Sequence, residues 1–157
     1  MSAPVTGDKI DGLVERAVFG AEEKVREESR RQIGELARRE GIYPASIQGL
    51  YEAAGKRAYH HKTVPAINIR GMTYQVARAV FRAVLKSKVG AFIFEIARSE
   101  IGYTKQRPAE YATGIMAAAI KEGFEGPVFL QGDHFQIDRK KYRANKEQET
   151  ENVKRLI

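Results

Sequence analysis

The chain has 157 residues, 43% of them hydrophobic and 30% charged, which is typical of a globular domain with a core of its own. It contains no cysteine, no basic-then-apolar signal pattern and no apolar run near the ~18 residues of a membrane span, so we expect a cytoplasmic protein without disulfides, thiolate ligands or a membrane partner. The net charge of +7 lies entirely in residues 61–157, with seventeen Lys/Arg and ten Asp/Glu, which indicates either an anionic partner or a solvated basic surface.

Residues 1–60 are predicted to form an N-terminal helical extension. Apolar residues at helical spacing predict a first helix that Gly20 interrupts. A highly charged helix is expected over residues 21–39, and its thin apolar face suggests that it lies on a surface or against a partner chain. Gly41 is expected to end this helix, and a third helix is predicted after Ser46.

Residues 61–157 alternate between strand and helix patterns. The predicted strands are 64–69, 89–97 and 128–131, and the predicted helices are 73–86, 108–122 and 146–157. This alternation predicts an α/β fold with a parallel sheet and right-handed crossovers. Three such units cannot close an eight-stranded barrel, and a three-stranded sheet leaves two bare edges. We therefore expect either a small open α/β domain or the N-terminal part of a longer protein, and we favour the second.

Polar residues follow each predicted strand. Asn68 lies at the end of the first strand, Ser99 comes after the second, and the pair Asp133 and His134 comes after the third. The carboxyl ends of parallel strands share one edge of the sheet. We therefore expect these four residues to line one pocket. An acid beside a metal-competent imidazole suits metal-assisted acid/base chemistry. Gly132, just before the pair, is expected to allow an unusual backbone angle or the close approach of a ligand.

Each of these residues also has a structural interpretation. Asn68 and Ser99 could stabilise turns, and His134 could be a hydrogen-bonded structural histidine. Three further features are interpreted as structural or surface groups: a solvated Arg98–Glu100 pair, His60-His61 before the first strand, and the basic run Arg139–Arg143, which could otherwise contact a phosphate backbone.

Several segments resemble the class II, metal-dependent ketose-bisphosphate aldolases, and in particular the branch with an N-terminal helical extension. The matching segments are Val64-Pro-Ala-Ile-Asn-Ile-Arg-Gly71, Phe94-Glu-Ile-Ala-Arg-Ser-Glu-Ile-Gly-Tyr-Thr104, Gln106-Arg-Pro-Ala-Glu-Tyr111 and Gly126-Pro-Val-Phe-Leu-Gln-Gly-Asp-His134, with Ser46-Ile-Gln-Gly-Leu-Tyr51 in the extension. The resemblance implies a TIM (β/α)8 barrel, of which residues 61–157 would supply the first three βα units after the extension of residues 1–60.

The resemblance also implies an activity and a role for each residue. The activity is the reversible cleavage of a fructose- or tagatose-bisphosphate to dihydroxyacetone phosphate and an aldehyde phosphate. Asp133 matches the aspartate that exchanges a proton with the C4 hydroxyl, and His134 matches the first histidine ligand of the divalent metal, usually zinc. Ser99 is similar in place to a serine that contacts a substrate phosphate, and Asn68 matches an asparagine near the substrate. The implied ligand is thus a phosphorylated sugar, and we expect a homo-oligomer.

One departure from the family pattern concerns the metal. No histidine follows His134, whereas a catalytic zinc takes three protein ligands. We therefore expect the 157-residue chain alone to be inactive, and robust metal-dependent bisphosphate cleavage by it would contradict this.

Two alternatives to a catalytic aldolase remain. A non-catalytic aldolase-like subunit that assists a catalytic partner also has a Gly-Tyr-Thr and a Gly-Asp-His at similar places, as in residues 102–104 and 132–134. A nucleic-acid-binding module that uses the basic part is the least favoured alternative.

Overall fold

The structure, a computed structural model, describes residues 7–156 and has an α/β fold with a four-stranded parallel sheet. The strands are β1 (Ile42–Ala45), β2 (Ala66–Asn68), β3 (Ile93–Ala97) and β4 (Gly126–Asp133), in the order β1-β4-β3-β2. The predicted α/β class and parallel sheet are confirmed, and the three predicted strands are neighbours in chain order.

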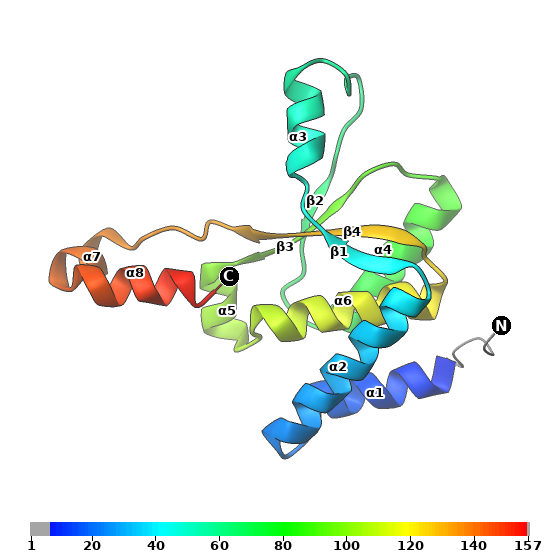
Figure 1. Cartoon of the computed structure of the whole chain (residues 1–157), viewed down its shortest axis with the longest axis horizontal. Coiled ribbons are helices and arrows are strands. Elements are labelled where there is room, and N and C mark those ends of the chain that lie inside the picture. Colours follow the sequence, from blue (N-terminus) through cyan, green and yellow to red (C-terminus); the bar gives the residue numbers. More distant parts are fainter. Residues whose placement is uncertain (1–6, 157) are drawn as a thin grey trace.

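Most of the helices lie on one side of this sheet (Figure 1). They are α1 (Gly7–Phe19), α2 (Glu23–Arg39), α3 (Gln48–Gly55), α4 (Thr73–Ser87), α5 (Arg98–Thr104), α6 (Pro108–Glu122), α7 (Arg139–Ala144) and α8 (Lys146–Lys154). Pro108 begins α6 as predicted, because its fixed φ suits the first helical position. Within residues 7–156, no helix is both long enough and apolar enough to cross a membrane.

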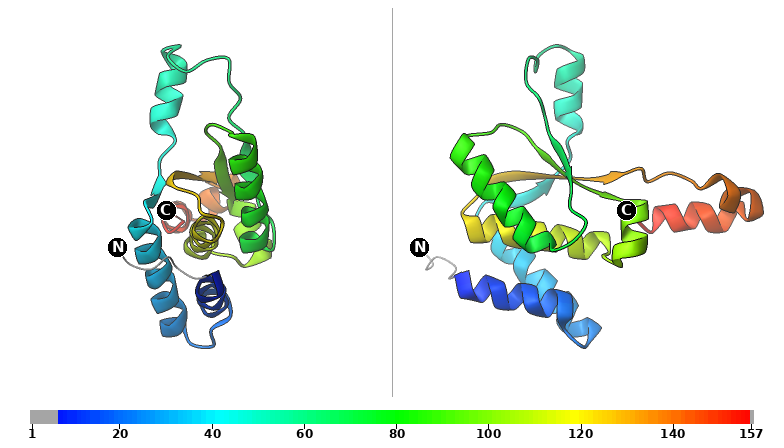
Figure 2. Two further views of the ribbon diagram at one scale, coloured as in Figure 1. Left: turned by 90° about the vertical axis from the view of Figure 1, so that its right-hand side faces the viewer. Right: turned by 180° about the vertical axis from the view of Figure 1, so that it is seen from behind.

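The hydrophobic core lies between one face of the sheet and the helices α4 and α6, which pack against each other (Figures 1 and 2). At its centre Phe81 of α4 is fully buried, with its ring centroid 4.9 Å from that of Phe124 and 5.4 Å from that of Phe94 on β3. Helices α1 and α2 form a further layer beneath α6. The described helices of this core thus cover the sheet from a single side.

The opposite face of the sheet carries polar side chains. Because side chains alternate along a strand, Phe94 and Ile96 of β3 enter the helix-side core while Glu95 points the other way. Glu95 is nevertheless buried and accepts a hydrogen bond from Gln131 of β4. Helix α3, which has no fully buried residue, projects from this side (Figure 1), and its Tyr51 hydroxyl lies 3.3 Å from Gln131 Oε1.

Strand β1 was not predicted, because residues 42–45 lie in a segment expected to be helical. It pairs in parallel with β4, from Ile42 opposite Gly126 to Ala45 opposite Phe129. Four residues containing a proline give no readable alternation, and Pro44 is tolerated because the strand lies at the sheet edge. The pairing therefore depends on the edge of a strand more than eighty residues away. The division of the chain near residue 60 stays a prediction.

The charged helix α2 packs within its own chain. Ser29, Ile33 and Ala37 form its buried face, and it contacts α1 and α6. It ends as predicted: Gly41 has φ +73°, a left-handed conformation that suits glycine. One ion pair joins its first half to α6, where Nη2 of Arg30 lies 3.8 Å from Oε2 of Glu110.

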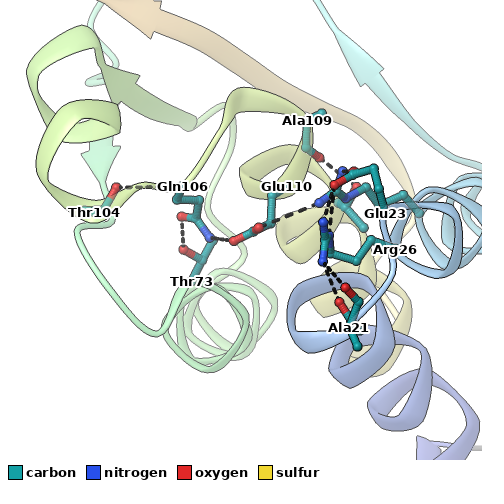
Figure 3. Close-up of polar contacts among 11 residues, drawn as sticks. Ala21, Glu23, Arg26, Thr73, Thr104, Gln106, Ala109 and Glu110 are labelled. Atoms are coloured by element: carbon teal, nitrogen blue, oxygen red, sulfur yellow. Dashed lines mark hydrogen bonds and ion pairs between the residues drawn. The ribbon is translucent and has the colours of Figure 1, made fainter.

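The same network continues from α6 to the loop before it and to α4. Glu110 accepts from Gln106, whose side-chain carbonyl in turn accepts from Thr73 at the start of α4, over 2.6 Å (Figure 3). The N-terminal helices and the strand-connecting helices are therefore joined by polar contacts as well as by the core.

Candidate functional site at the carboxyl ends of the strands

The carboxyl ends of β2, β3 and β4 lie side by side at one edge of the sheet. Asn68 is the last residue of β2, and Asp133, the last of β4, lies opposite Ala97, the last of β3. Asn68 Nδ2 is 3.4 Å from Asp133 Oδ2, although the two residues are 65 positions apart. The structure thus brings these two predicted site residues into contact.

Asp133 also contacts the residue that follows it. Its Oδ1 pairs with Nδ1 of His134, and this leaves Nε2 of the imidazole for another partner. The Asp133 side chain is 28% exposed and that of His134 is 73% exposed, so the pair is accessible to a ligand. His134 has φ +50°, a left-handed conformation that is costly for a residue with a side chain, and the chain bends locally there at the end of β4.

Glu100 belongs to the same cluster, and the sequence interpretation missed it. It is 3% exposed, and its Oε2 accepts hydrogen bonds from the Ala97 backbone N–H (2.9 Å) and from Asn68 Nδ2 (3.2 Å). Its Oε1 lies 2.7 Å from Nε of Arg70. The Asn68 amide thus stands between the carboxylates of Glu100 and Asp133.

The expected solvated pair of Arg98 and Glu100 is wrong. The residues after β3 form helix α5, which places Glu100 at the third helical position, where a glutamate commonly reaches back to the backbone N–H before the helix. A glutamate three positions beyond the end of the apolar strand was the signal available in the sequence. Arg98 instead contacts Glu149 of α8 and the backbone carbonyl of Gln136.

Ser99 lies at the start of α5 and is exposed. It lines a groove of about 560 Å³ whose wall also includes His134, Gln136, Asp138 and Lys141. Ser99 and His134 therefore share this groove, while Asn68 and Asp133 meet directly across the strand ends.

The far wall of the groove is held by a buried ion pair. Both Glu149 oxygens accept from Arg98, over 2.6 and 3.0 Å, and Oε1 also accepts from the Asp138 backbone N–H. These contacts lower the pKa of Glu149 to about 2, mainly because of Arg98. The basic run from Arg139 forms helix α7, and Asp138 caps it by accepting from the backbone N–H groups of Lys140 and Lys141.

The side chain of Phe135 accounts for the glycine at position 132. A Cβ atom at this position would lie 2.5 Å from Cδ2 of Phe135, so the absence of a side chain makes room for the Phe135 ring. This ring packs against the helix-side core. The close approach that was expected of a ligand at Gly132 is therefore made by a residue of the same chain, and Gly132 does not adopt the expected unusual backbone angle.

The donor atoms present do not complete a catalytic zinc site. His134 offers one imidazole nitrogen, and a catalytic zinc takes three protein ligands. Within residues 7–156 no group of three or more His, Asp or Glu side chains is placed to hold a metal ion. The described part of the chain thus supplies one ligand of such a site and not the complete set.

The strand ends therefore carry an amide, two carboxylates and an imidazole in one hydrogen-bonded cluster. Such a set can bind the hydroxyl groups of a ligand and can accept or return a proton. Comparisons of the chain with protein-family models, curated proteins and solved structures found no match.

Proposed function

We propose that this chain carries part of the substrate site of a class II ketose-bisphosphate aldolase, which reversibly cleaves a fructose- or tagatose-bisphosphate. The observation that carries the proposal is the contact of Asn68 with Asp133, which is itself paired with His134. These residue types, at these strand ends, are the ones that the resemblance assigns to substrate and metal.

The sheet topology supports this proposal. Strands β2, β3 and β4 are adjacent in chain order, and their connecting helices α4 and α6 pack together on one face. A doubly wound fold would place helices on both faces, whereas successive βα units of a barrel place theirs on the outside only. We propose that these strands correspond to the first three units of a (β/α)8 barrel, with the polar face of Glu95 and Gln131 toward its interior.

The proposed roles follow from the groups that each side chain presents. Asp133, partly exposed and anchored through both oxygens, acts as the proton carrier at a sugar hydroxyl. Asn68 orients that hydroxyl, and Ser99 contacts a phosphate from the groove that it shares with His134. His134 contributes one ligand of a divalent metal, with zinc the first candidate. The partner is a phosphorylated sugar, bound by a homo-oligomer.

The proposal predicts where a ketose bisphosphate binds. In a titration of the isotopically labelled chain with fructose 1,6-bisphosphate, we expect saturable shifts of the backbone amide signals of Asn68, Glu100, Asp133 and His134. Inorganic phosphate at the same concentration should move them less, because it lacks the sugar hydroxyls. Asn68→Asp should weaken binding about tenfold, since it places a third carboxylate beside two others and removes the amide donors.

A matched control is Asn145→Asp at the start of α8, which makes the same chemical change away from the strand ends, keeps a side-chain oxygen to cap the helix and should leave the affinity unchanged. A comparison of amide spectra shows whether each variant is folded. Absence of saturable binding, or shifts confined to other parts of the chain, would contradict the proposed function.

A further inference from the structure

Arg70 is an exposed cation held in place by a buried anion. It follows β2 by two residues, its side chain is 62% exposed, and its Nε lies 2.7 Å from Oε1 of Glu100, whose side chain is only 4% exposed. The ion pair engages Nε, so the terminal nitrogens of the guanidinium remain for a second anion. A guanidinium restrained in this way loses less conformational entropy when it binds an anion than a free surface arginine does.

Glu100 fixes Arg70 relative to the rest of the cluster. Its other oxygen accepts from Asn68 and from the Ala97 backbone, so its position is set by two strands at once. Because Asn68 also contacts Asp133, one buried carboxylate ties the guanidinium to the proposed proton carrier.

Arg98, at the end of the neighbouring strand, differs from Arg70 in how its donors are used. It contacts both oxygens of the buried Glu149 and the carbonyl of Gln136, so its Nη atoms are already used. Arg98 therefore serves the structure of the groove, whereas Arg70 has donors left for a ligand.

We infer that Arg70 binds a phosphate group of the ligand at this site, and that Glu100 is the positioning residue that presents it. A planar guanidinium matches a phosphate through paired N–H donors, which a point charge such as lysine does not. The cation also offsets the repulsion between an incoming phosphate and the carboxylates of Glu100 and Asp133. This inference rests on the proposed function for the identity of the sugar, but the phosphate contact can be tested without it.

The test uses the whole chain with two probes, inorganic phosphate and fructose 1,6-bisphosphate. We expect millimolar phosphate to shift the side-chain Nε–Hε signal of Arg70. Arg70→Gln should weaken the binding of both probes about tenfold. Arg70→Lys should recover only part of this affinity, because lysine restores the positive charge without the paired N–H donors of the guanidinium. Glu100→Gln should weaken phosphate binding less than Arg70→Gln, since it loosens the guanidinium without removing it.

The matched control is Arg139→Gln on the exposed helix α7, which should not change either affinity. Arg70→Gln should also keep the wild-type melting temperature within a few degrees, because Glu100 retains its contacts with Ala97 and Asn68. Wild-type phosphate affinity in Arg70→Gln, or no phosphate binding by the wild-type chain, overturns the inference.

The two proposals fail in different ways. Arg70-dependent phosphate binding without bisphosphate shifts at Asn68 and Asp133 would support the inference and contradict the proposed function. Bisphosphate binding at Asn68 and Asp133 that is unaffected by Arg70→Gln would do the reverse.

Discussion

At the residue scale, His134 is held by two local constraints. Its left-handed backbone turns the chain out of β4, and its Nδ1 is paired with the carboxylate of Asp133. A carboxylate on one ring nitrogen orients the imidazole and leaves the other nitrogen for a metal, as is common for ligating histidines. The structural and the ligand interpretations of His134 are thus compatible, since the same contact serves both.

These constraints predict how the chain binds zinc. We expect His134→Ala to lower zinc affinity several-fold in an isothermal titration, because it removes the oriented imidazole at the strand ends. The double variant His60→Ala/His61→Ala is the control: both residues are exposed and their rings lie 4.4 Å apart, before β2 rather than after it. Equal zinc affinity in the wild type and in His134→Ala would remove His134 as a ligand.

At the element scale, the segments after the strands are more ordered than their polar sequences indicate. Helix α5 begins directly at the end of β3, and α7 and α8 extend beyond β4 (Figure 1). Helix α8 has few apolar residues of its own, and its buried residue is Glu149, which is 1% exposed. The position of α8 therefore depends strongly on the ion pair between Glu149 and Arg98.

This dependence predicts a pH-sensitive contribution to stability. The pKa of Glu149 is lowered from its ordinary 4.5 to about 2, so the ion pair stabilises the folded chain fully above about pH 4.5 and is lost as the pH falls through 2. Glu149→Gln should therefore lower the melting temperature at pH 7 and should differ less from the wild type near pH 2. Glu147→Gln, an exposed carboxylate on the same helix, is the control and should melt like the wild type at both pH values. A constant difference between Glu149→Gln and the wild type across this range would refute the linkage.

At the scale of the whole molecule, a cluster of aromatic rings joins α4, the sheet and the segment after α6. Phe81 has no exposed surface, and its ring contacts those of Phe92, Phe94 and Phe124 at centroid distances of 4.9 to 5.9 Å. Because these residues come from different elements, the cluster fixes how the helices are placed against the strands.

Removal of the central ring should therefore destabilise the whole fold. We expect Phe81→Ala to reduce the free energy of unfolding by about 3–5 kcal/mol, through lost burial and the cavity that remains. Phe19→Ala is the matched control: this phenylalanine is 80% exposed, and its loss should change the free energy by less than about 0.5 kcal/mol. Urea unfolding followed by circular dichroism measures both, and similar values for the two variants would contradict this account of the core.

Elements whose signals are local could be predicted from the sequence alone. The bounds of α4 and α6 were predicted almost to the residue. The signals for these helices are the helical spacing of apolar residues and, for α6, a proline in the first turn, and both signals depend only on residues close together in the sequence. The order of β2, β3 and β4, and hence the contact of Asn68 with Asp133, followed from the rule that parallel strands in successive βα units lie side by side.

Features that depend on distant partners could not be predicted from the sequence and follow from the packing of the folded chain. Strand β1 forms on the free edge of β4. Glu100 accepts a hydrogen bond from Asn68 and forms an ion pair with Arg70 because α5 begins at the strand end. Gly132 is small because Phe135 folds back onto it. None of these contacts has a periodic signature in the sequence, since each is formed by side chains or edges that meet only when the chain has folded. Local patterns thus specified which residues reach the strand ends, and packing specified which of them touch.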